Sequence, residues 1–263
     1  MKDEFWSERG IAYRTNTFEK SRETLVFIHG LASSSSIWEP FELALEHSFN
    51  ILTYDMRGHG LSKRYKNYDD YDLKSFADDL QALLDHVGIN SCSLVSHSMG
   101  TIVALFFQRY YSGTVRKNLF LAPAHKQHSL LGPAARGILT LFVELFSWMP
   151  FTPGHGKRLD YSKFGYCRDL EGRRLFPEIK NMSLRLYFYC MAHVYAFAHD
   201  NWWSEIRIPT TIVHGTKDTF APYRLALELS KAIPDAKIVT LEGANHLLVI
   251  NNKREITMQI LEL

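Results

Sequence analysis

A serine flanked by small residues is the first feature that points to chemistry. Segment 96–100 reads SHSMG and joins a predicted strand to a predicted helix that starts at Ser98. A nucleophilic serine needs a sharp strand-to-helix turn, and that turn tolerates only small residues two positions away on either side. Ser96 and Gly100 meet this requirement, and the helix N-terminus adds a positive dipole end. The sequence therefore predicts Ser98 as a nucleophile; the plain alternative is a serine-rich junction without a chemical role.

A nucleophilic serine needs a base, and the base needs a carboxylate that orients it. Asp218 lies in a turn just after the predicted strand 210–214, and His246 lies in a turn just after the predicted strand 237–241. In a parallel sheet, turns that follow strands meet at one edge, where such sheets place their sites. We therefore predict His246 as the base and Asp218 as its partner. Asp200 is the nearest rival carboxylate, but no predicted core strand precedes it.

Two backbone amides are candidates for stabilising negative charge next to the serine. His29, Gly30 and Leu31 close the first strongly apolar strand, and Met99 directly follows Ser98. Acyl transfer needs N–H donors aimed at the developing oxyanion. The amides of Leu31 and Met99 are predicted to converge there; the alternative is an ordinary turn at the end of a strand.

A glycine-rich turn, 55–62 (DMRGHGLS), follows the next predicted strand. It matches neither GxGxxG nor GxxxxGK[ST], the patterns that hold phosphate groups. We therefore interpret it as a structural turn.

These turns depend on an alternation of short apolar runs and helical patterns. Most of the runs are apolar at successive positions, as expected for parallel strands covered on both faces. Strands are predicted at 24–29, 50–55, 93–96, 118–122, 210–214 and 237–241, and helices at 37–46, 73–87, 98–111, 223–233 and 251–261. In helix 73–87 seven apolar residues form one stripe, and Gly88 follows at the C-cap. The alternation predicts an α/β fold with a mostly parallel, doubly wound sheet.

The interval 124–205 interrupts this alternation. It contains no convincing strand, and it is rich in aromatic residues within helix-like segments. Its ten Lys and Arg outnumber its seven Asp and Glu, a net charge of +3, which leaves the rest of the chain at −1. We predict a helical insertion over 124–205 that lies above one end of a core formed by 1–123 and 206–263.

Composition excludes several classes of protein. Hydrophobic residues make up 46% of the 263 residues and aromatic residues 13%, which excludes a disordered chain. A net charge of +2 without a dense basic run is too small for a nucleic-acid footprint. Neither a metal-binding HExxH nor a dinucleotide fingerprint occurs, so we expect no metal and no cofactor.

The expected location is the cytoplasm. Three cysteines without a CxxC pair suit a reducing compartment rather than a disulfide scaffold. The N-terminal residues lack the apolar core of a secretory signal. The longest apolar stretches, 137–150 and 184–198, are interrupted by charged residues, and neither reaches the ~18 apolar residues of a membrane span.

Taken together, the motifs resemble the α/β-hydrolase fold superfamily over nearly the whole chain. The resemblance lies in five features: His29-Gly30, the DxRGHGxS turn 55–62, the strand-to-helix turn 96–100 (the nucleophile elbow), the turn 215–218 and His246. It implies a triad of Ser98, His246 and Asp218, an oxyanion hole formed by Leu31 and Met99, and a cap over 124–205. The serine at 98 differs from the aspartate of epoxide hydrolases, and the HGGG loop of hormone-sensitive lipases is lacking. The elbow and the RGHG turn are more similar to monoacylglycerol lipases and small carboxylesterases.

The expected activity is the hydrolysis of small-molecule carboxylic esters through an acyl-serine. Two alternatives stay open, because one scaffold hosts many functions: a low-turnover receptor or partner-binding protein, and a thioesterase or carbon–carbon bond hydrolase. The expected substrate pocket consists of His29, Phe142, Trp148, Tyr187 and Trp202, although the cap aromatics can equally form the cap's own core. Transient contact with a lipid surface is a further expectation. The chain is expected to be a monomer or a homodimer.

Overall fold

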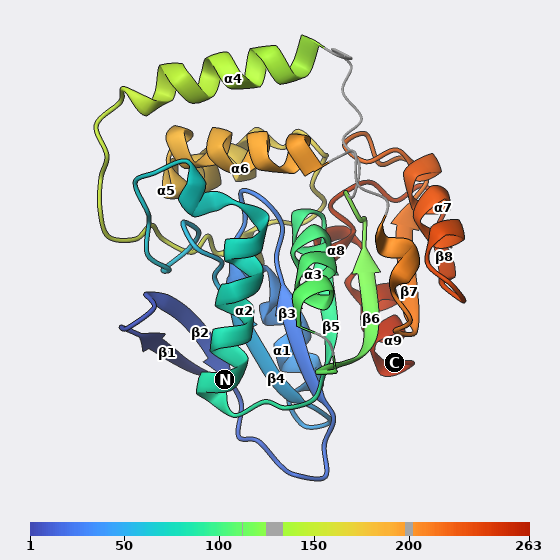
Figure 1. Cartoon of the computed structure of the whole chain (residues 1–263). Helices are drawn as coiled ribbons and strands as arrows, with labels where there is room; N and C mark the ends of the chain where they lie inside the picture. The colour runs from blue at the N-terminus through green and yellow to red at the C-terminus, as the bar shows by residue number, and fades with distance from the viewer. Residues whose placement is uncertain (112, 125–133, 198–201) are drawn as a thin grey trace.

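The chain forms one eight-stranded sheet in a computed structural model that describes residues 1–111, 113–124, 134–197 and 202–263 (Figure 1). The strands are β1 (Lys2–Trp6), β2 (Ile11–Thr15), β3 (Thr24–Ile28), β4 (Asn50–Tyr54), β5 (Cys92–His97), β6 (Val115–Leu121), β7 (Thr210–Gly215) and β8 (Lys237–Leu241). Their order in the sheet is β1-β2-β4-β3-β5-β6-β7-β8, and all pairs from β4 to β8 are parallel. After β3 the chain adds β4 on one side of β3 and then β5 on its other side. This reversal of direction makes a topological switch point between β3 and β5.

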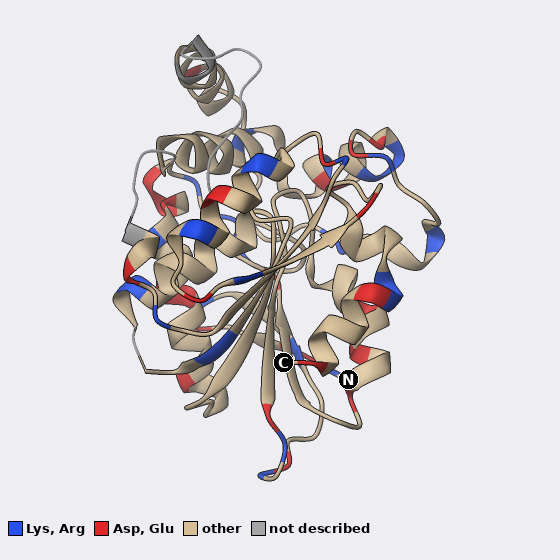
Figure 2. Cartoon of the chain, turned by 90° about the vertical axis from the view of Figure 1, so that its right-hand side faces the viewer, with Lys and Arg blue, Asp and Glu red and all other residues tan. Residues whose placement is uncertain are grey.

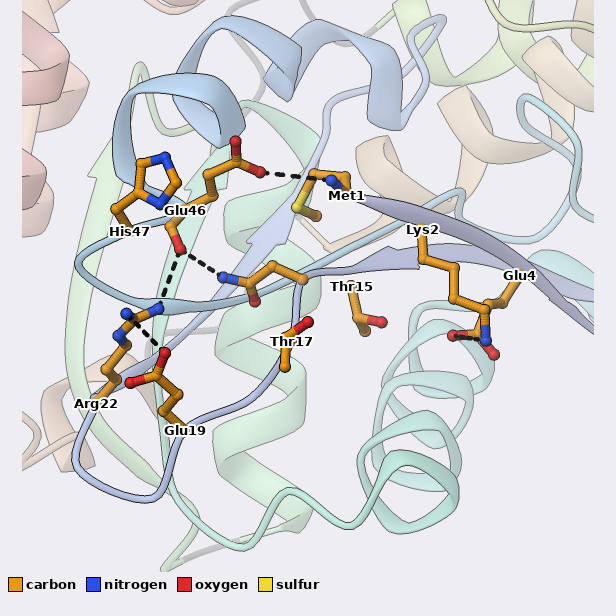
Figure 3. A pocket seen from close by; sticks show the side chains of 10 residues that line it. Met1, Lys2, Glu4, Thr15, Thr17, Glu19, Arg22, Glu46 and His47 are labelled. Atoms are coloured by element: carbon orange, nitrogen blue, oxygen red, sulfur yellow. Dashed lines mark hydrogen bonds and ion pairs between the residues drawn. The ribbon is translucent and has the colours of Figure 1, made fainter.

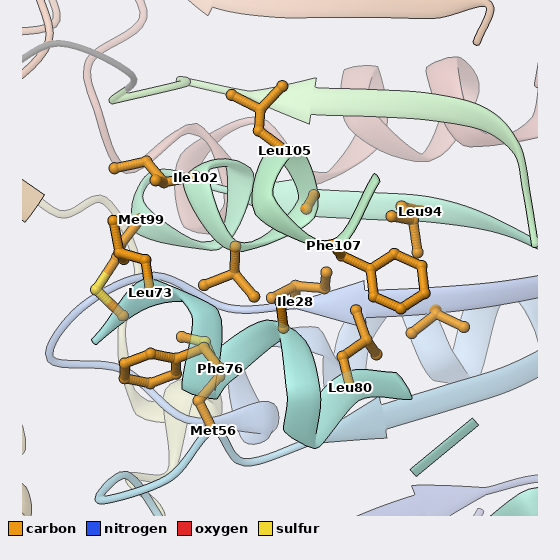
Figure 4. Close-up of a cluster of buried hydrophobic side chains, with 14 of the residues drawn as sticks. Ile28, Met56, Leu73, Phe76, Leu80, Leu94, Met99, Ile102, Leu105 and Phe107 are labelled. Carbon is orange, nitrogen blue, oxygen red and sulfur yellow. The ribbon is translucent and has the colours of Figure 1, made fainter. Parts of the chain in front are cut away.

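Helices cover both faces of the sheet, as Figure 1 shows. They are η1 (Ser35–Trp38), α1 (Glu39–Leu45), η2 (Asp69–Tyr71), α2 (Leu73–Val87), α3 (Met99–Tyr110), α7 (Tyr223–Ala232), α8 (Leu248–Asn251) and α9 (Lys253–Leu261). Successive strand residues face opposite sides, so Val26 and Ile28 of β3 pack with α2 and α3, whereas Leu25 and Phe27 pack with α1 and α9. Figure 4 shows the first cluster, where Phe107 lies between Leu94 and Leu80, and Phe76 lies beside Met56. The predicted α/β fold with a mostly parallel, doubly wound sheet is therefore confirmed.

Helix α2 shows how local sequence determines an element that supports the site. Asp72 caps its N-terminus by accepting a hydrogen bond from the Ser75 amide at 2.6 Å. Gly88 ends the helix in the left-handed conformation, with φ of 80°, and its N–H bonds to carbonyls of the last turn. Between these caps, one apolar stripe faces the sheet. The predicted helix 73–87 and its glycine cap are therefore both correct.

Two strands are absent from the prediction. β1 and β2 form an antiparallel pair at the edge of the sheet, and β2 pairs with β4. The outer strand β1 is mostly charged and largely exposed, so it lacks the apolar run that reveals the central strands. At the other end of the chain, the predicted helix 251–261 is found as α9, which starts two residues later at Lys253, and the short helix α8 before it was not predicted.

The interval 124–205 has no strand among its described residues. It contains α4 (Ala134–Ser147), η3 (Tyr161–Lys163), α5 (Gly172–Met182), α6 (Leu184–Phe197) and η4 (Trp202–Glu205). Helix α6 lies over the carboxyl ends of the strands, and α4 lies on the outer side of α6 (Figure 1). This interval therefore lies at the edge of the sheet where the turns after β3, β5, β7 and β8 meet.

Candidate active site

Ser98 lies in a strained turn between β5 and α3. Its φ of 52° and ψ of −120° are unusual for a residue with a side chain, and Ser98 is partly exposed. A Cβ atom on Gly100 would lie only 2.5 Å from the carbonyl oxygen of Ile28, so this position has no space for a larger residue. The packing of α3 against β3 thus requires the glycine, and the turn holds the Ser98 hydroxyl away from its own backbone.

The structure brings Ser98, His246 and Asp218 into one hydrogen-bonded line. Ser98 Oγ lies 2.8 Å from Nε2 of His246, and His246 Nδ1 lies 2.7 Å from Oδ2 of Asp218. The other carboxylate oxygen of Asp218 accepts hydrogen bonds from the amides of Phe220 and Ala221, at 2.9 and 2.8 Å. Because the carboxylate only accepts, His246 donates from Nδ1 and presents an acceptor nitrogen to the serine hydroxyl. This is the geometry in which an imidazole removes a proton from a serine.

Asp218 is ionised at neutral pH despite its burial. Burial acts to raise the pKa of its carboxyl group, but the charge and hydrogen bond of His246 and the hydrogen bond from the Ala221 amide together outweigh that effect. The pKa of Asp218 therefore lies below its ordinary value. The negative charge of Asp218 lies next to Nδ1 of His246, where it orients the imidazole ring.

Two further histidines, His97 and His214, lie against these three residues, and neither was predicted as a site residue. His97 bonds through Nε2 to the carbonyl oxygen of His246 at 2.9 Å. Burial, helped by the charge of His246, lowers the pKa of His97 to about 3, so His97 is a neutral donor. His214 lies with Nε2 3.3 Å from Asp218, and its pKa is also lowered by burial. Their positions beside Ser98 and Asp218 were the only sequence signal available for them.

The amides of Leu31 and Met99, which the sequence predicts as oxyanion donors, make no backbone hydrogen bond among the described residues. Met99 is the first residue of α3, so its N–H has no acceptor within the helix. The Leu31 amide donates no hydrogen bond to any described residue. Gly30 brings this loop against the serine, because a Cβ atom there would lie 3.1 Å from Ser98 Cβ. The two amides are therefore free to bind a ligand oxygen.

His29, one of the five expected pocket residues, serves the backbone instead. It is fully buried, its Nε2 accepts a hydrogen bond from the Met56 amide at 3.0 Å, and its Nδ1 bonds to the Gly30 carbonyl at 2.7 Å. Because both ring nitrogens are used, His29 has no polar atom left to offer a ligand. It is better explained as a support of the loop that carries Leu31.

The aromatic pocket candidates lie in different environments. Phe142 stacks on Phe188 at a ring distance of 4.8 Å, within the contact of α4 with α6. Trp148 is 89% exposed, whereas Tyr187 is partly buried. The side chain of Trp202 lies outside the described residues. Of the three described candidates, Phe142 packs between α4 and α6, Trp148 is exposed, and Tyr187 packs against the buried cluster of the sheet.

Hydrogen bonds to Asp55 hold the glycine-rich turn 55–62 in place. The Asp55 carboxylate accepts from the amides of Ser35 and Leu61 and from Arg158, at 2.6 to 2.9 Å. A Cβ atom on Gly60 would overlap that carboxylate at 2.3 Å. These contacts agree with the interpretation of 55–62 as a structural turn, since Asp55 ties it to the loop after β3.

Two cavities of the described chain lie away from Ser98. One of about 700 Å³ lies between β1, β2 and the end of α1, and its charges pair within it: Glu46 with the amino terminus, Arg22 with Glu19 (Figure 3). Another, of about 630 Å³, lies beside Trp148 and Phe151. The described residues contain no group of three or more His, Cys, Asp or Glu side chains that could hold a metal ion.

Comparison with known proteins agrees with the fold. A family model described as the alpha/beta hydrolase fold matches residues 23–253. The chain belongs to the α/β-hydrolase fold family. It is 24% identical over 266 residues to a non-heme chloroperoxidase from Kitasatospora aureofaciens (90% of each chain). It is 28% identical over 239 residues to a putative carbamate hydrolase from Pseudomonas savastanoi pv. phaseolicola (84% of this chain, 86% of the relative).

Solved structures share the architecture of this family member. The enol-lactonase from Burkholderia xenovorans LB400 superposes with a TM-score of 0.74 at 21% identity, covering 96% of this chain and 95% of the lactonase. The sequence-based resemblance to α/β hydrolases is thus confirmed, and family membership supports a hydrolase activity. Among the described residues, no helix is both long enough and apolar enough to cross a membrane.

Proposed function

We propose that this α/β hydrolase cleaves carboxylic esters of small molecules through an acyl-serine intermediate, with Ser98, His246 and Asp218 as its triad. The observation that carries the proposal is the continuous hydrogen-bonded line from Ser98 Oγ to the buried carboxylate of Asp218. The serine at its end is partly exposed and lies beside two amides that are free to bind a ligand oxygen.

Each group then has one role in the reaction. His246 takes the proton from Ser98 as the hydroxyl attacks the ester carbonyl, and later returns that proton to the leaving alcohol. Water attacks the resulting acyl-serine with the same assistance from His246. The Leu31 and Met99 amides stabilise the oxyanion of both tetrahedral intermediates, a contribution of about 3 kcal/mol for each donor in enzymes of this kind.

The interval 124–205 is proposed to serve as the cap over this site. Its helix α6 lies over the carboxyl ends of the strands, so a ligand at Ser98 is enclosed from that side (Figure 1). Partly buried aromatic residues such as Tyr187 favour an apolar acyl or aromatic group. The enol-lactonase neighbour, named for a cyclic enol ester, is consistent with the ester class.

A lipid surface is proposed as a transient contact of the outer face of α4. Figure 2 shows this helix at the top of the molecule. Large apolar residues of α4 and of the two positions after it are 36 to 89% exposed: Ile138, Leu141, Leu145, Trp148 and Met149. Exposed tryptophan next to aliphatic residues suits the boundary between lipid and water. The net charge of +3 on the interval favours anionic lipid.

The central test is chemical labelling of the serine. A fluorophosphonate should add once per chain, on the peptide that contains Ser98, because only an activated serine attacks this reagent. Ser98→Ala should abolish labelling and lower ester hydrolysis by roughly 10⁴-fold or more, with an unchanged circular dichroism spectrum. Ser162→Ala, at an exposed serine of η3, is the matched control and should behave like wild type. Absence of any adduct on Ser98 in folded protein would contradict the proposal.

The ester class itself is tested by parallel assays. p-Nitrophenyl esters from acetyl to lauroyl, an acyl-CoA and a vinylogous diketone should separate esterase, thioesterase and carbon–carbon hydrolase activity. We expect turnover of the esters, with a preference for longer acyl chains. A burst of one product per chain, followed by a very slow steady state, would instead favour a receptor.

A further inference from the structure

One aspartate from the interval 124–205 connects the two loops that carry His246 and Asp218. Asp169 is buried, with 6% of its surface exposed. Its Oδ1 accepts a hydrogen bond from the backbone amide of His246 at 2.8 Å. Its Oδ2 accepts two from Thr219, the residue after Asp218: from the amide at 2.8 Å and from the hydroxyl at 2.6 Å. One carboxylate therefore holds both loops at once.

The backbone around Asp169 is attached to the same histidine loop. The Cys167 carbonyl accepts from the side-chain amides of Asn245 and Asn251, both at 2.8 Å. The Cys167 amide in turn donates to Asn251 Oδ1, also at 2.8 Å. These contacts fix segment 167–169 against the residues on either side of His246, so the Asp169 side chain has a firm base.

The charge of Asp169 is balanced by hydrogen-bond donors rather than by a cation. Among the described residues, no Lys or Arg nitrogen lies within 4.0 Å of its carboxylate. A buried carboxylate without a cation is costly unless donors satisfy it, and here two backbone amides and one hydroxyl do so. Such an arrangement is sensitive to replacement, because an amide in its place would turn a donor toward an N–H group.

We propose that Asp169 is a positioning residue of the catalytic site, which sets the separation of the Asp218 and His246 loops. The proposal rests on the proposed serine-hydrolase function. The imidazole of His246 bonds to Asp218 at 2.7 Å and to Ser98 at 2.8 Å, and both bonds require the two loops to keep their separation. Displacement of either loop lengthens one of these bonds, and proton transfer from Ser98 slows because the alignment of reacting groups is lost. Asp169 is buried and both of its carboxylate oxygens bond to these loops, so we expect binding of the ester to be unaffected.

Asp169→Asn tests this role, because it keeps the size of the side chain but supplies only one acceptor oxygen. We expect kcat to fall about 10- to 100-fold with KM unchanged. The reason is that the single oxygen of asparagine can hold only one of the two loops, so the charge-assisted hydrogen bonding to the other loop is lost at a buried site. The second-order rate of fluorophosphonate labelling should fall by the same factor. Thr219→Val removes only the hydroxyl bond and should cost less than about 5-fold. Asp160→Asn, at an exposed aspartate of the same interval, is the matched control.

Active-site titration separates positioning from simple stability. The amount of label taken up at completion counts folded sites, and kcat is then expressed per titrated site. A purely structural Asp169 would lower the titre or the melting temperature but keep the wild-type kcat per site, and this would overturn the inference. Equal labelling rates for wild type and Asp169→Asn would overturn it as well. Wild-type protein that takes up no label would contradict the proposed function, and the inference with it.

Discussion

The outer helix α4 and the inner segment 161–197 belong to the same interval of the chain but relate to the sheet differently. The inner segment is part of the core: Tyr161 and Cys167 are buried in one apolar cluster of the sheet, and Leu186 and Cys190 are buried in the other. Helix α4 packs on α6, while much of its opposite face is exposed (Figure 2).

The contacts of two arginines, Arg174 and Arg185, show the same difference between the inner segment and α4. Arg174 on α5 is buried and donates to the Ala32 carbonyl at 3.0 Å, in the loop that carries Leu31. Arg185 on α6 donates to the carbonyls at the end of α4, those of Phe146, Ser147 and Met149. The inner segment therefore contacts the loops of the candidate site, whereas the links from Arg185 to the end of α4 stay within the interval. Changes in the first region should alter chemistry and stability, and changes in the second should alter neither strongly.

The largest effect on stability is expected at Glu178, in the inner segment. Burial raises the pKa of Glu178 to about 7, despite the hydrogen bond from Tyr161. The folded protein thus binds this proton more tightly than the unfolded chain, whose glutamates titrate near pH 4.3. The stabilising contribution is present below about pH 4 and is lost as the pH rises through 7. Between pH 5 and pH 8 the loss amounts to about 3 kcal/mol.

Glu178→Gln should remove this loss, because glutamine stays neutral. Urea unfolding of both proteins at pH 5 and pH 8 gives the comparison. The buried histidines, such as His97, titrate in the opposite direction in both proteins, so their contribution cancels in the difference. An identical pH dependence for wild type and variant would mean that the carboxyl of Glu178 is not held in a buried, neutral form.

A smaller effect, on activity, is expected at Arg174. Arg174→Met removes the bond to the Ala32 carbonyl, which frees the loop that presents the Leu31 amide, so kcat/KM should fall about 10-fold. Arg185→Met is the paired variant, since it loosens only the end of α4, and turnover of a short ester should stay within about 3-fold. If the two arginines behave alike, the distinction between inner segment and outer helix is wrong.

The smallest effect on turnover is expected on the outer face of α4. The double variant Leu141→Ser with Leu145→Ser should hydrolyse p-nitrophenyl acetate within about 2-fold of wild type, because both side chains face away from α6. Sedimentation with vesicles that contain anionic lipid should drop by about 10-fold or more, since each leucine loses its transfer free energy. Wild-type protein that does not sediment with these vesicles would contradict the proposed lipid contact.

Local patterns in the sequence were sufficient to predict most strands of the sheet and the three hydrogen-bonded residues of the candidate site. Central strands are recognisable because both faces are buried and successive residues are apolar, and helix 73–87 carries its own caps. Ser98, Asp218 and His246 were identifiable because they lie in the turns that follow β5, β7 and β8, and strand ends converge in a parallel sheet. The edge strand β1 was missed because one exposed strand has no such pattern.

Tertiary structure alone decided which residues support those three. Asp169 lies 49 residues before Asp218 and 77 before His246, in an interval whose local sequence predicts only helices, and nothing in its neighbours indicates the two loops it joins. His29 gives the converse case: its place at the end of a strand favoured a pocket, but packing buries both ring nitrogens against backbone groups. Strand-end positions are set by local periodicity, whereas hydrogen bonds between distant loops depend on how the whole chain packs.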